Sequence, residues 1–434
     1  MRKGESGVSL TVTFVSNYIN HHQIPFCEAL RKQLGSGFVF VQMEDMEEER
    51  RRMGWEDRSL ELDWVIRWKE NRKEAEREIE SCDLLLAGWV PEIQELLAKR
   101  LRVHRPVFQI SERIYKDGQW KAISPRGLIS KYQAFTRYRR EPYFLLCAGA
   151  YVASDYHLVG AFPDKMYRWG YFPPLEVYEE GKPPIRHRGG KDAAQLVWAG
   201  RFVGFKHVEQ VLFLADRLQR DRRNFVLHIL GDAGIGNEKA AEEAHRYVTE
   251  HGLEDAVVFH GFCTPEAVRD VMESSDIFVF TSDHGEGWGA VLNEAMNSGC
   301  APVANAQAGA VPYLVQNGVN GYIYADGDFE DLVAKTERLI DDTQLCERFA
   351  ATSWRAVAAC WNAEVAAKRF LAFGEKALDY CEERRRRLAG GVRRENLNME
   401  ALNEELPVEG PMSLAPILRP FLQVPRMAPA RKLS

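Results

Sequence analysis

The sequence predicts an α/β protein of two domains, each a doubly wound parallel sheet with helices on both faces. Short apolar runs alternate with amphipathic helical patterns along most of the chain, which is typical of βα units. The chain has 434 residues, which is more than one hydrophobic core usually supports. A stretch rich in Pro, Gly and charged residues over positions 173–192 interrupts the alternation and indicates a linker.

The strands are expected where apolar runs are short enough to cross a buried sheet. In the first half these runs are Val8–Ser16, Phe38–Gln42, Asp63–Trp68, Leu84–Gly88, Val107–Ser111, Tyr143–Gly149 and Met166–Phe172. After the linker they are Leu196–Gly200, Phe225–Gly231, Val257–Gly261, Ile277–Ser282, Ala301–Asn305 and Tyr322–Tyr324. A long helical pattern then covers about Asn362–Leu388. The tail beyond Gly390 has scattered Pro and little periodicity, which predicts an extended or disordered arm.

Composition limits the classes of function. Hydrophobic residues make up 45% and charged residues 28%, as in ordinary globular proteins, and the net charge of -6 gives no sign of nucleic-acid binding. The eight Cys lack CxxC or Cys/His ligand spacing, so we expect reduced packing residues such as Cys82, Cys147 and Cys300. The polar start and the lack of an apolar run near 18 residues predict neither signal peptide nor membrane span. The expected location is therefore cytoplasmic.

The most informative stretch is EGWGAVLNEAMNSG, which runs from Glu286 to Gly299. It follows the apolar run Ile277–Ser282, and its glycines predict a turn without side-chain bulk. From Ala290 the pattern is helical, and Gly299 ends the helix. A Gly-rich turn that leads into a helix presents free backbone N–H groups and the positive helix end to an anion.

Two carboxylates belong to this stretch, Glu286 at the mouth of the turn and Glu294 two turns inside the helix. At a rise of about 1.5 Å per residue they lie roughly 10–12 Å apart. Glycosidase carboxylate pairs are separated by about 5–9.5 Å. The longer spacing suits two ends of one extended ligand, such as a diphosphate with hydroxyl-bearing sugars on both sides. The alternative is that both residues are solvated surface charges.

With Pro302 and Val303, this stretch forms an EGWG…NEAM…G-x-P-V frame that resembles the retaining nucleotide-sugar glycosyltransferases of glycosyltransferase family 4, which have the GT-B fold. A second motif of that family stands upstream as LVWAGRFVGFKH. It contains Arg201 and Lys206, and the resemblance implies that both hold the pyrophosphate of the donor. A guanidinium fork and an ammonium group would both stabilise the charge on a departing nucleoside diphosphate. The alternative for both residues is ordinary surface charge.

The resemblance also implies the roles of the remaining donor residues. Arg201, Lys206 and Glu286 would be catalytic, with Glu286 holding hydroxyls of the donor sugar. Glu294 would bind the ribose. The backbone N–H groups that complete the anion site would come from Gly287, Trp288, Gly289, Ala290 and Val291. No metal and no cofactor is expected, and the nucleoside diphosphate sugar, with UDP as the default, is the substrate.

The sequence pattern and the resemblance together divide the chain into four parts. These are an N-terminal Rossmann-like acceptor-binding domain at 1–185, a C-terminal Rossmann-like nucleotide-sugar-binding domain at 186–361, a helix at 362–390 that returns to the first domain, and an extended or disordered tail at 391–434.

Weaker signals lie at the ends of other strands. Gly231 belongs to a loop whose glycine spacing does not match the dinucleotide fingerprint, yet the family places this loop near the nucleotide. Phe262 follows a strand where the family reads the base, and a plain strand-to-helix turn is the alternative. Asp326-Gly-Asp328 resembles the metal-binding DxD motif of another fold, but its position predicts a turn and a helix N-cap. Tyr313 stands where the family often has Glu.

The first half resembles the family less closely. Its first strand leads into a loop with polar side chains where many relatives have glycines, and Asn17, Asn20, His21 and His22 are candidates to touch the acceptor or the diphosphate. A capping loop with exposed His is the alternative. Relatives often carry a sugar-contacting His after a later strand. The matching stretch here has Ser111 and Glu112 instead.

Basic residues gather in two groups of the first half. The first group is Lys99, Arg100, Arg102, His104 and Arg105, and the second is Arg126, Lys131, Arg137, Arg139 and Arg140, interleaved with Tyr132, Phe135 and Tyr138. Such residues suit peripheral contact with the inner face of an anionic membrane or a lipid-linked acceptor. A solvated helix face is the alternative.

The expected function is transfer of a sugar from a nucleoside diphosphate sugar to a saccharide or lipid-linked saccharide, with retention of configuration. Two other enzymes of the same fold remain open, a nucleotide-sugar epimerase and a glycan phosphorylase. An epimerase should show further carboxylates near the sugar, and a phosphorylase usually carries a pyridoxal-binding Lys. A catalytically silent scaffold that only binds a partner is an alternative of another class.

Overall fold

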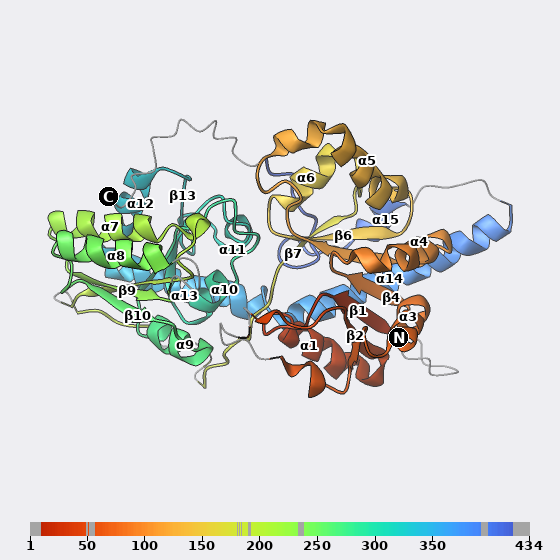
Figure 1. Cartoon of the computed structure of the whole chain (residues 1–434), viewed down its shortest axis with the longest axis horizontal. Helices are drawn as coiled ribbons and strands as arrows, with labels where there is room; N and C mark the ends of the chain where they lie inside the picture. Colours follow the sequence, from red (N-terminus) through yellow and green to blue (C-terminus); the bar gives the residue numbers. More distant parts are fainter. Residues whose placement is uncertain are drawn as a thin grey trace. The chain divides into compact units, whose positions relative to one another are not determined.

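The computed structural model describes residues 10–48, 51, 57–179, 181, 183, 185–189, 192–232, 238–391 and 398–419 (Figure 1). The chain forms two compact units. Unit 1 comprises Met1–Ala148, Val152–Tyr171 and Ala363–Ile417, and unit 2 comprises Gly149–Tyr151, Phe172–Asn362 and Leu418–Ser434.

Unit 1 is built on a sheet of seven parallel strands in the order β3-β2-β1-β4-β5-β6-β7. The strands are β1 (Val12–Ser16), β2 (Phe38–Gln42), β3 (Val65–Arg67), β4 (Leu84–Ala87), β5 (Val107–Ser111), β6 (Tyr143–Ala148) and β7 (Met166–Trp169). Most of their side chains are buried because helices cover both faces, as the continuous apolar runs predict. A strand is present at each expected position, but several are shorter than expected. Leu10 and Thr11 precede β1, Asp63 and Trp64 precede β3, and the expected strand Met166–Phe172 ends at Trp169. Val8 and Ser9 lie outside the described residues.

The connections of unit 1 supply its helices. They are α1 (Ile24–Leu34), α3 (Arg72–Ser81), α4 (Gln94–Arg102), α5 (Pro125–Ala134), α6 (Val152–Leu158), α14 (Ala363–Ala389) and α15 (Met399–Asn403), with short 3-10 turns that include η2 (Arg58–Leu60), η4 (Gln119–Ile123) and η5 (Thr136–Tyr138). α14 is the long helix that the sequence predicts. Its Phe370 lies 5.0 Å from Phe108 of β5 between ring centroids, and Gly374 approaches β4 so closely that a Cβ there would lie 2.3 Å from Leu84.

Unit 2 has a sheet of six parallel strands in the order β10-β9-β8-β11-β12-β13. They are β8 (Ala194–Ala199), β9 (Phe225–Leu230), β10 (Val257–Gly261), β11 (Ile277–Phe280), β12 (Ala301–Asn305) and β13 (Tyr322–Tyr324). The helices are α7 (Val208–Arg220), α8 (Glu238–Glu250), α9 (Pro265–Glu273), α10 (Ala290–Asn297), α11 (Val311–Leu314), α12 (Phe329–Asp341) and α13 (Thr343–Ala359), preceded by the turn η6 (Gly204–Lys206). The strand order reverses between β8 and β11, where ligands bind in open parallel sheets.

The linker and the tail are both packed against a unit. The described part of the linker has no helix or strand, but Arg186 donates to Asp276 of unit 2 at 3.1 Å. The expectation of an extended or disordered arm is wrong for residues 398–419, where α15 forms and Leu414 makes an antiparallel bridge to Tyr167 of β7. The segment is held because it satisfies the backbone groups of an edge strand. The rest of the tail, 392–397 and 420–434, lies outside the described residues.

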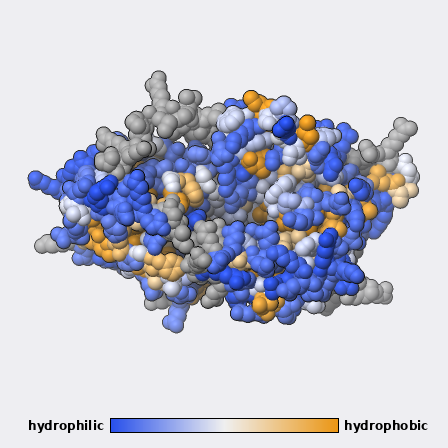
Figure 2. Space-filling view, viewed as in Figure 1, coloured by the Kyte–Doolittle hydropathy of each residue, from blue (hydrophilic) through white to orange (hydrophobic). Residues whose placement is uncertain are grey.

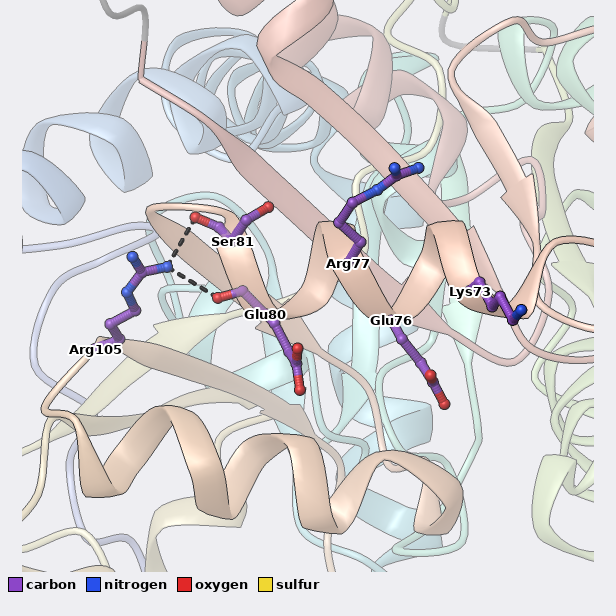
Figure 3. A pocket seen from close by; sticks show the side chains of 6 residues that line it. All are labelled: Lys73, Glu76, Arg77, Glu80, Ser81 and Arg105. Atoms are coloured by element: carbon purple, nitrogen blue, oxygen red, sulfur yellow. Dashed lines mark hydrogen bonds between the residues drawn. The ribbon is translucent and has the colours of Figure 1, made fainter.

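Two members of the first group of basic residues, Arg100 and Arg105, have a structural role. Arg100 is 2% exposed, and its guanidinium donates to the carbonyl oxygens at the end of α3 and in the loop that follows. Arg105 donates to the carbonyls of Glu80 and Ser81 at 2.9 and 2.8 Å, beside an open groove of about 390 Å³ (Figure 3). Arg100 and Arg105 therefore tie α3 to α4, whereas Arg102 is exposed and membrane contact stays a prediction.

Candidate active site

Four strands of unit 2 end at the edge where the expected donor residues lie. Because the sheet is parallel, the carboxyl ends of β8, β9, β10 and β11 share one edge. Arg201 follows β8, Gly231 follows β9, Phe262 follows β10, and Glu286 follows β11. The sheet therefore gathers residues that are up to 85 positions apart in the sequence, from 201 to 286, at its ligand-binding edge.

The turn between β11 and α10 requires its glycines. Gly289 has φ +98°, in the left-handed region, and a Cβ there would lie 2.5 Å from the ring of Phe280. A Cβ on Gly309 would lie 1.8 Å from the carbonyl oxygen of Gly287. The backbone of Gly309 also donates to Glu286 O at 3.2 Å. The segment after β12 thus packs directly on the turn and fixes its shape.

The start of α10 offers several backbone donors. The first bond of this turn runs from the N–H of Leu292 to Gly289 O at 3.0 Å. Within the described part of the chain, the N–H groups of residues 287–291 donate to no protein acceptor. Unpaired N–H groups at the positive end of a helix form an anion site. The position of these N–H groups agrees with the Gly-rich motif, and anion binding by them stays a prediction.

Lys206 and Glu286 form an ion pair at this edge. Their side chains are 14% and 15% exposed, so the pair is largely shielded from water. The backbone of Lys206 is fixed by a hydrogen bond, because the hydroxyl of Thr281 donates to Lys206 O at 2.6 Å. The same hydroxyl accepts a bond from the indole N–H of Trp198 at 2.9 Å. The sequence predicted both residues for the site but did not predict that they contact each other.

His207 is a site residue that the sequence did not single out. It has φ 54°, in the left-handed region, and its two ring nitrogens lie 2.7 Å from Glu209 and 2.9 Å from Asp283. Burial disfavours the imidazolium, but the hydrogen bonds to both carboxylates prevail and raise its pKa to about 10. His207 is therefore cationic at neutral pH. A signal was present in the sequence, because Asp283 directly follows the strand that leads to Glu286.

Asp283 joins the two loops of the site. Its backbone N–H donates to Phe205 O at 2.9 Å, and its carboxylate accepts from the N–H of Gly285 at 2.7 Å. Burial acts to raise the pKa of Asp283, but the bonds from His207 and Gly285 hold that pKa below its usual value. The loop that carries Lys206 and the turn that carries Glu286 are thus fixed together by backbone and side-chain bonds.

Glu294 lies inside α10 with open hydrogen-bonding capacity. Its carboxylate accepts no hydrogen bond from the residues that the structure describes. Burial raises its pKa, while the charges of Arg269 and Lys206 oppose that shift. Lys206 therefore acts electrostatically on both carboxylates of the motif. An unsatisfied carboxylate of this kind is a ready acceptor for ligand hydroxyls.

Trp288 and Tyr313 belong to the core of unit 2. The Trp288 indole is 1% exposed, donates to Asn293 at 2.9 Å, and lies 5.7 Å from Trp361 between ring centroids. Tyr313 stacks on the same Trp361 at 5.6 Å. Only the backbone of Trp288 is therefore available to a ligand.

Packing explains why residue 231 is a glycine, whereas Phe262 has an exposed side chain. A Cβ on Gly231 would lie 2.2 Å from Gly200 O, so packing of two strand ends already requires glycine there. The side chain of Phe262 is 58% exposed after β10, as a residue available to stack on a base should be.

The candidates of unit 1 also follow strand ends, β1 and β5. In the first loop Asn20 accepts from the N–H of His22 at 3.0 Å and donates to Gln23 at 3.1 Å, while Ser16 donates to Asn17 at 3.1 Å. Burial lowers the pKa of His21 to about 4, so this ring is neutral at physiological pH. These bonds lie within the loop itself, and Gln23, the N-cap residue of α1, makes no side-chain capping bond.

In the second loop, Ser111 donates to Glu112 O at 2.8 Å and lies at 2.8 Å from the hydroxyl of Tyr156. The Glu112 carboxylate accepts from Lys116 at 2.5 Å and from Tyr171 at 3.0 Å. Both candidate side chains are therefore engaged by neighbours in unit 1.

The Asp326-Gly-Asp328 segment is a turn and a cap, as predicted. Asp328 is the N-cap of α12 and accepts from the N–H of Asp331 at 3.0 Å, and Asp326 accepts from Asn305 at 2.7 Å. In the described residues, no group of three or more His, Cys, Asp or Glu side chains is placed to hold a metal ion. Within the same residues no helix combines the length and apolarity that crossing a membrane requires.

Comparisons with known proteins agree with this geometry. Residues 184–353 match the family described as glycosyl transferases group 1. The alpha-D-kanosaminyltransferase of Streptomyces kanamyceticus is 27% identical over 40% of this chain and 43% of its own length. The sulfoquinovosyl transferase SQD2 of Arabidopsis thaliana is 31% identical over 38% of this chain and 30% of its own length. The matches thus span less than half of these curated relatives.

Among solved structures, Anabaena Alr3699/HepE in complex with UDP superimposes with a TM-score of 0.64 and 16% identity, over 84% of this chain and 98% of that one. Together with the two parallel-sheet units, this likeness shows the GT-B fold. The expected fold class is confirmed, and the group 1 glycosyltransferase family is supported by the match to residues 184–353.

Proposed function

We propose that this chain, whose residues 184–353 match the group 1 glycosyltransferases, is a retaining glycosyltransferase of family 4 that uses a nucleoside diphosphate sugar. The observation that carries the proposal is the ion pair of Lys206 with Glu286 beside the unpaired N–H groups that begin α10. Unit 2 is the donor-binding domain, and unit 1 is the acceptor-binding domain. The acceptor is a saccharide or a lipid-linked saccharide.

The polar and charged groups of the site suit the diphosphate, the sugar and the ribose of such a donor in turn. The N–H groups of residues 287–291 and the ammonium group of Lys206 bind the diphosphate, and Arg201 adds a guanidinium fork. When phosphate oxygens take over Lys206, the Glu286 carboxylate becomes free to accept bonds from the sugar hydroxyls. Glu294, which accepts no protein hydrogen bond among the described residues, binds the ribose hydroxyls.

The proposed reaction uses this arrangement. The bond between the anomeric carbon and the diphosphate oxygen breaks, and its electron pair leaves with the diphosphate. Lys206, Arg201 and the helix end stabilise the charge that grows on that oxygen. The acceptor hydroxyl attacks from the same face, and its proton passes to the leaving phosphate oxygen. Fixed cations thereby do what a bound metal does in other transferases, so the reaction proceeds without a metal.

UDP is the first nucleotide to test, because a protein of the same fold, HepE, has been crystallised with it. The experiment is a thermal-shift and calorimetric panel of UDP, GDP, ADP and their sugars, followed by transfer assays with the donor that binds. A ligand at about a hundred times its dissociation constant adds about 2.7 kcal/mol to stability. Stabilisation by one nucleoside diphosphate, with release of that diphosphate on transfer, is expected. Stabilisation by none of them would refute the proposal.

Stereochemistry is tested on the same reaction. The anomeric proton of the product, observed by NMR, should show the coupling of the configuration present in the donor. An inverted product would exclude the same-face mechanism while leaving donor binding intact.

A further inference from the structure

One helix of unit 1 carries its apolar residues on the outside. α5 contains no buried residue, and the side chains of Leu128, Ile129 and Tyr132 are 41%, 58% and 57% exposed. At about 100° per residue these three lie within an arc of about 100°. The positions of the helix that turn toward the protein are instead Gly127, Lys131 and Ala134. A surface helix usually shows the reverse pattern, with its apolar arc on the core.

Neighbouring segments extend this apolar surface. In η4, directly before α5, Trp120 and Ile123 are 67% and 79% exposed. Trp89 is 52% exposed, and the ammonium group of Lys131 lies 5.8 Å from its ring centroid, which places Trp89 against α5. Figure 2 shows hydrophobic residues among hydrophilic ones where Figure 1 labels α5. We call this set the α5 face; its members are Trp89, Trp120, Ile123, Leu128, Ile129 and Tyr132.

The apolar exposure is concentrated rather than scattered. Sixteen large hydrophobic side chains are exposed among the described residues, and five of them lie between Trp120 and Tyr132. Single exposed apolar residues are normal on soluble proteins, whereas a cluster marks a surface that another phase or molecule covers.

The positive charge around the α5 face indicates that its partner is negatively charged. Residues 119–140 contain six basic residues and no acidic one, although the whole protein has a net charge of -6. The basic residues are Lys121, Arg126, Lys131, Arg137, Arg139 and Arg140. Lys131 packs under the face with its pKa lowered by burial, and Lys121 is paired with Asp117. The exposed arginines therefore carry most of the local positive charge that an anionic partner meets.

We propose that the α5 face docks on the surface of an anionic phospholipid bilayer. α5 lies in the plane of the interface, its aliphatic and aromatic side chains reach the boundary of the acyl chains, and the arginines contact lipid phosphates. Aliphatic Ile123 and Ile129 have no polar atom with which to recognise a glycan or a nucleic acid. A bilayer is the anionic partner that takes up both the aliphatic groups and the charges.

The experiment is sedimentation of the full chain with vesicles, in the absence of nucleotide sugar. Vesicles of phosphatidylcholine mixed with phosphatidylglycerol should bind the protein, and vesicles of phosphatidylcholine alone should bind it at least tenfold more weakly. Each Lys or Arg near the surface contributes about fivefold to partition, so raised salt should release the protein. The readout is independent of transferase activity.

Two pairs of variants identify the surface. Ile123→Glu should reduce vesicle binding by about tenfold or more, whereas Leu60→Glu, at a residue of unit 1 that is 78% exposed, should not. The double variant Arg126→Glu with Arg137→Glu should abolish binding to the anionic vesicles. Its control, Arg77→Glu with Arg102→Glu, changes the net charge equally at exposed positions on α3 and α4 and should bind as wild type.

Thermal denaturation of all variants checks folding, and these substitutions of exposed side chains should leave the melting temperature unchanged. Equal binding to neutral and anionic vesicles, or wild-type binding by Ile123→Glu, would overturn the proposal. So would a wild-type dimer that Ile123→Glu dissociates, because the α5 face would then be an interface between two copies. Binding to a soluble anionic glycan with no vesicle binding would also overturn it.

Discussion

Lys206, in the loop that follows β8, and Glu286, in the loop that follows β11, form an ion pair that is largely shielded from water. A charge pair of low exposure tolerates the loss of one partner poorly, because the remaining charge is left without compensation. However, an anionic group of a ligand can replace Glu286 as the partner of Lys206. A diphosphate that takes Lys206 would release Glu286 for hydrogen bonds, which couples the binding of phosphate to the binding of the sugar.

Lys206→Ala should reduce the rate of sugar transfer by about 10²-fold or more, because the leaving diphosphate loses a fixed positive charge. The variant also leaves the Glu286 carboxylate unpaired, at a cost of roughly 1–3 kcal/mol in stability. Adding Glu286→Ala should restore stability without restoring activity. Lys335→Ala removes a lysine paired with Asp331 on α12 and serves as the control. Wild-type turnover in Lys206→Ala would remove this residue from the mechanism.

Activity should survive chelation. The fixed cations of the site, Lys206 and Arg201, are proposed to carry the charge of the leaving diphosphate, so transfer measured with EDTA should equal transfer measured with Mg²⁺ or Mn²⁺. If EDTA abolishes turnover and a divalent ion restores it, the metal-free mechanism fails. Asp326 would then be the first residue to substitute.

The sequence predicts what depends on local pattern. Most strands of both sheets were recognisable because they are short apolar runs buried on two faces, as in β11 (Ile277–Phe280). The Gly-rich turn and the start of α10 were recognisable because Gly289 needs a left-handed backbone and the helical pattern begins directly after it. Local chemistry thus predicts an anion site at this turn, whereas the roles of its residues in donor binding are implied by the resemblance to a family.

What the sequence did not predict depends on distant partners. Arg100 looked like surface charge, but carbonyl groups from three other segments meet its guanidinium. Leu414 was expected in an extended or disordered tail, but it forms an antiparallel bridge to Tyr167, which lies 247 positions earlier (414 minus 167). His207 bonds two carboxylates, Glu209 close by in the sequence and Asp283, which the fold brings to 2.9 Å.

His207 should make stability depend on pH. Its pKa is raised to about 10 in the folded protein, against about 6.5 when unfolded, so its contribution is fully present below pH 6.5 and is lost as pH rises through 10. His207→Gly suits the left-handed backbone but removes the imidazolium. At pH 7 this variant should be less stable than wild type, and the difference should shrink toward pH 10. Denaturant midpoints of both proteins from pH 6 to 10 measure it. A difference independent of pH would show that His207 acts only through packing.

Substitution of Glu294 and substitution of Glu286 should affect different steps, nucleotide binding and sugar transfer. Glu294 is proposed to bind the ribose, which the free nucleotide and the nucleotide sugar share, so Glu294→Gln should weaken binding of the free nucleoside diphosphate by about 1–2 kcal/mol. Glu286 is proposed to bind the sugar, so Glu286→Gln should leave that affinity nearly unchanged and lower turnover instead. Its loss also frees Lys206, which adds a small opposite effect that favours phosphate. Calorimetric titration of both variants with UDP and GDP, beside a transfer assay, distinguishes them. Equal weakening of free nucleotide by both substitutions would show that the carboxylates do not bind opposite ends of the donor.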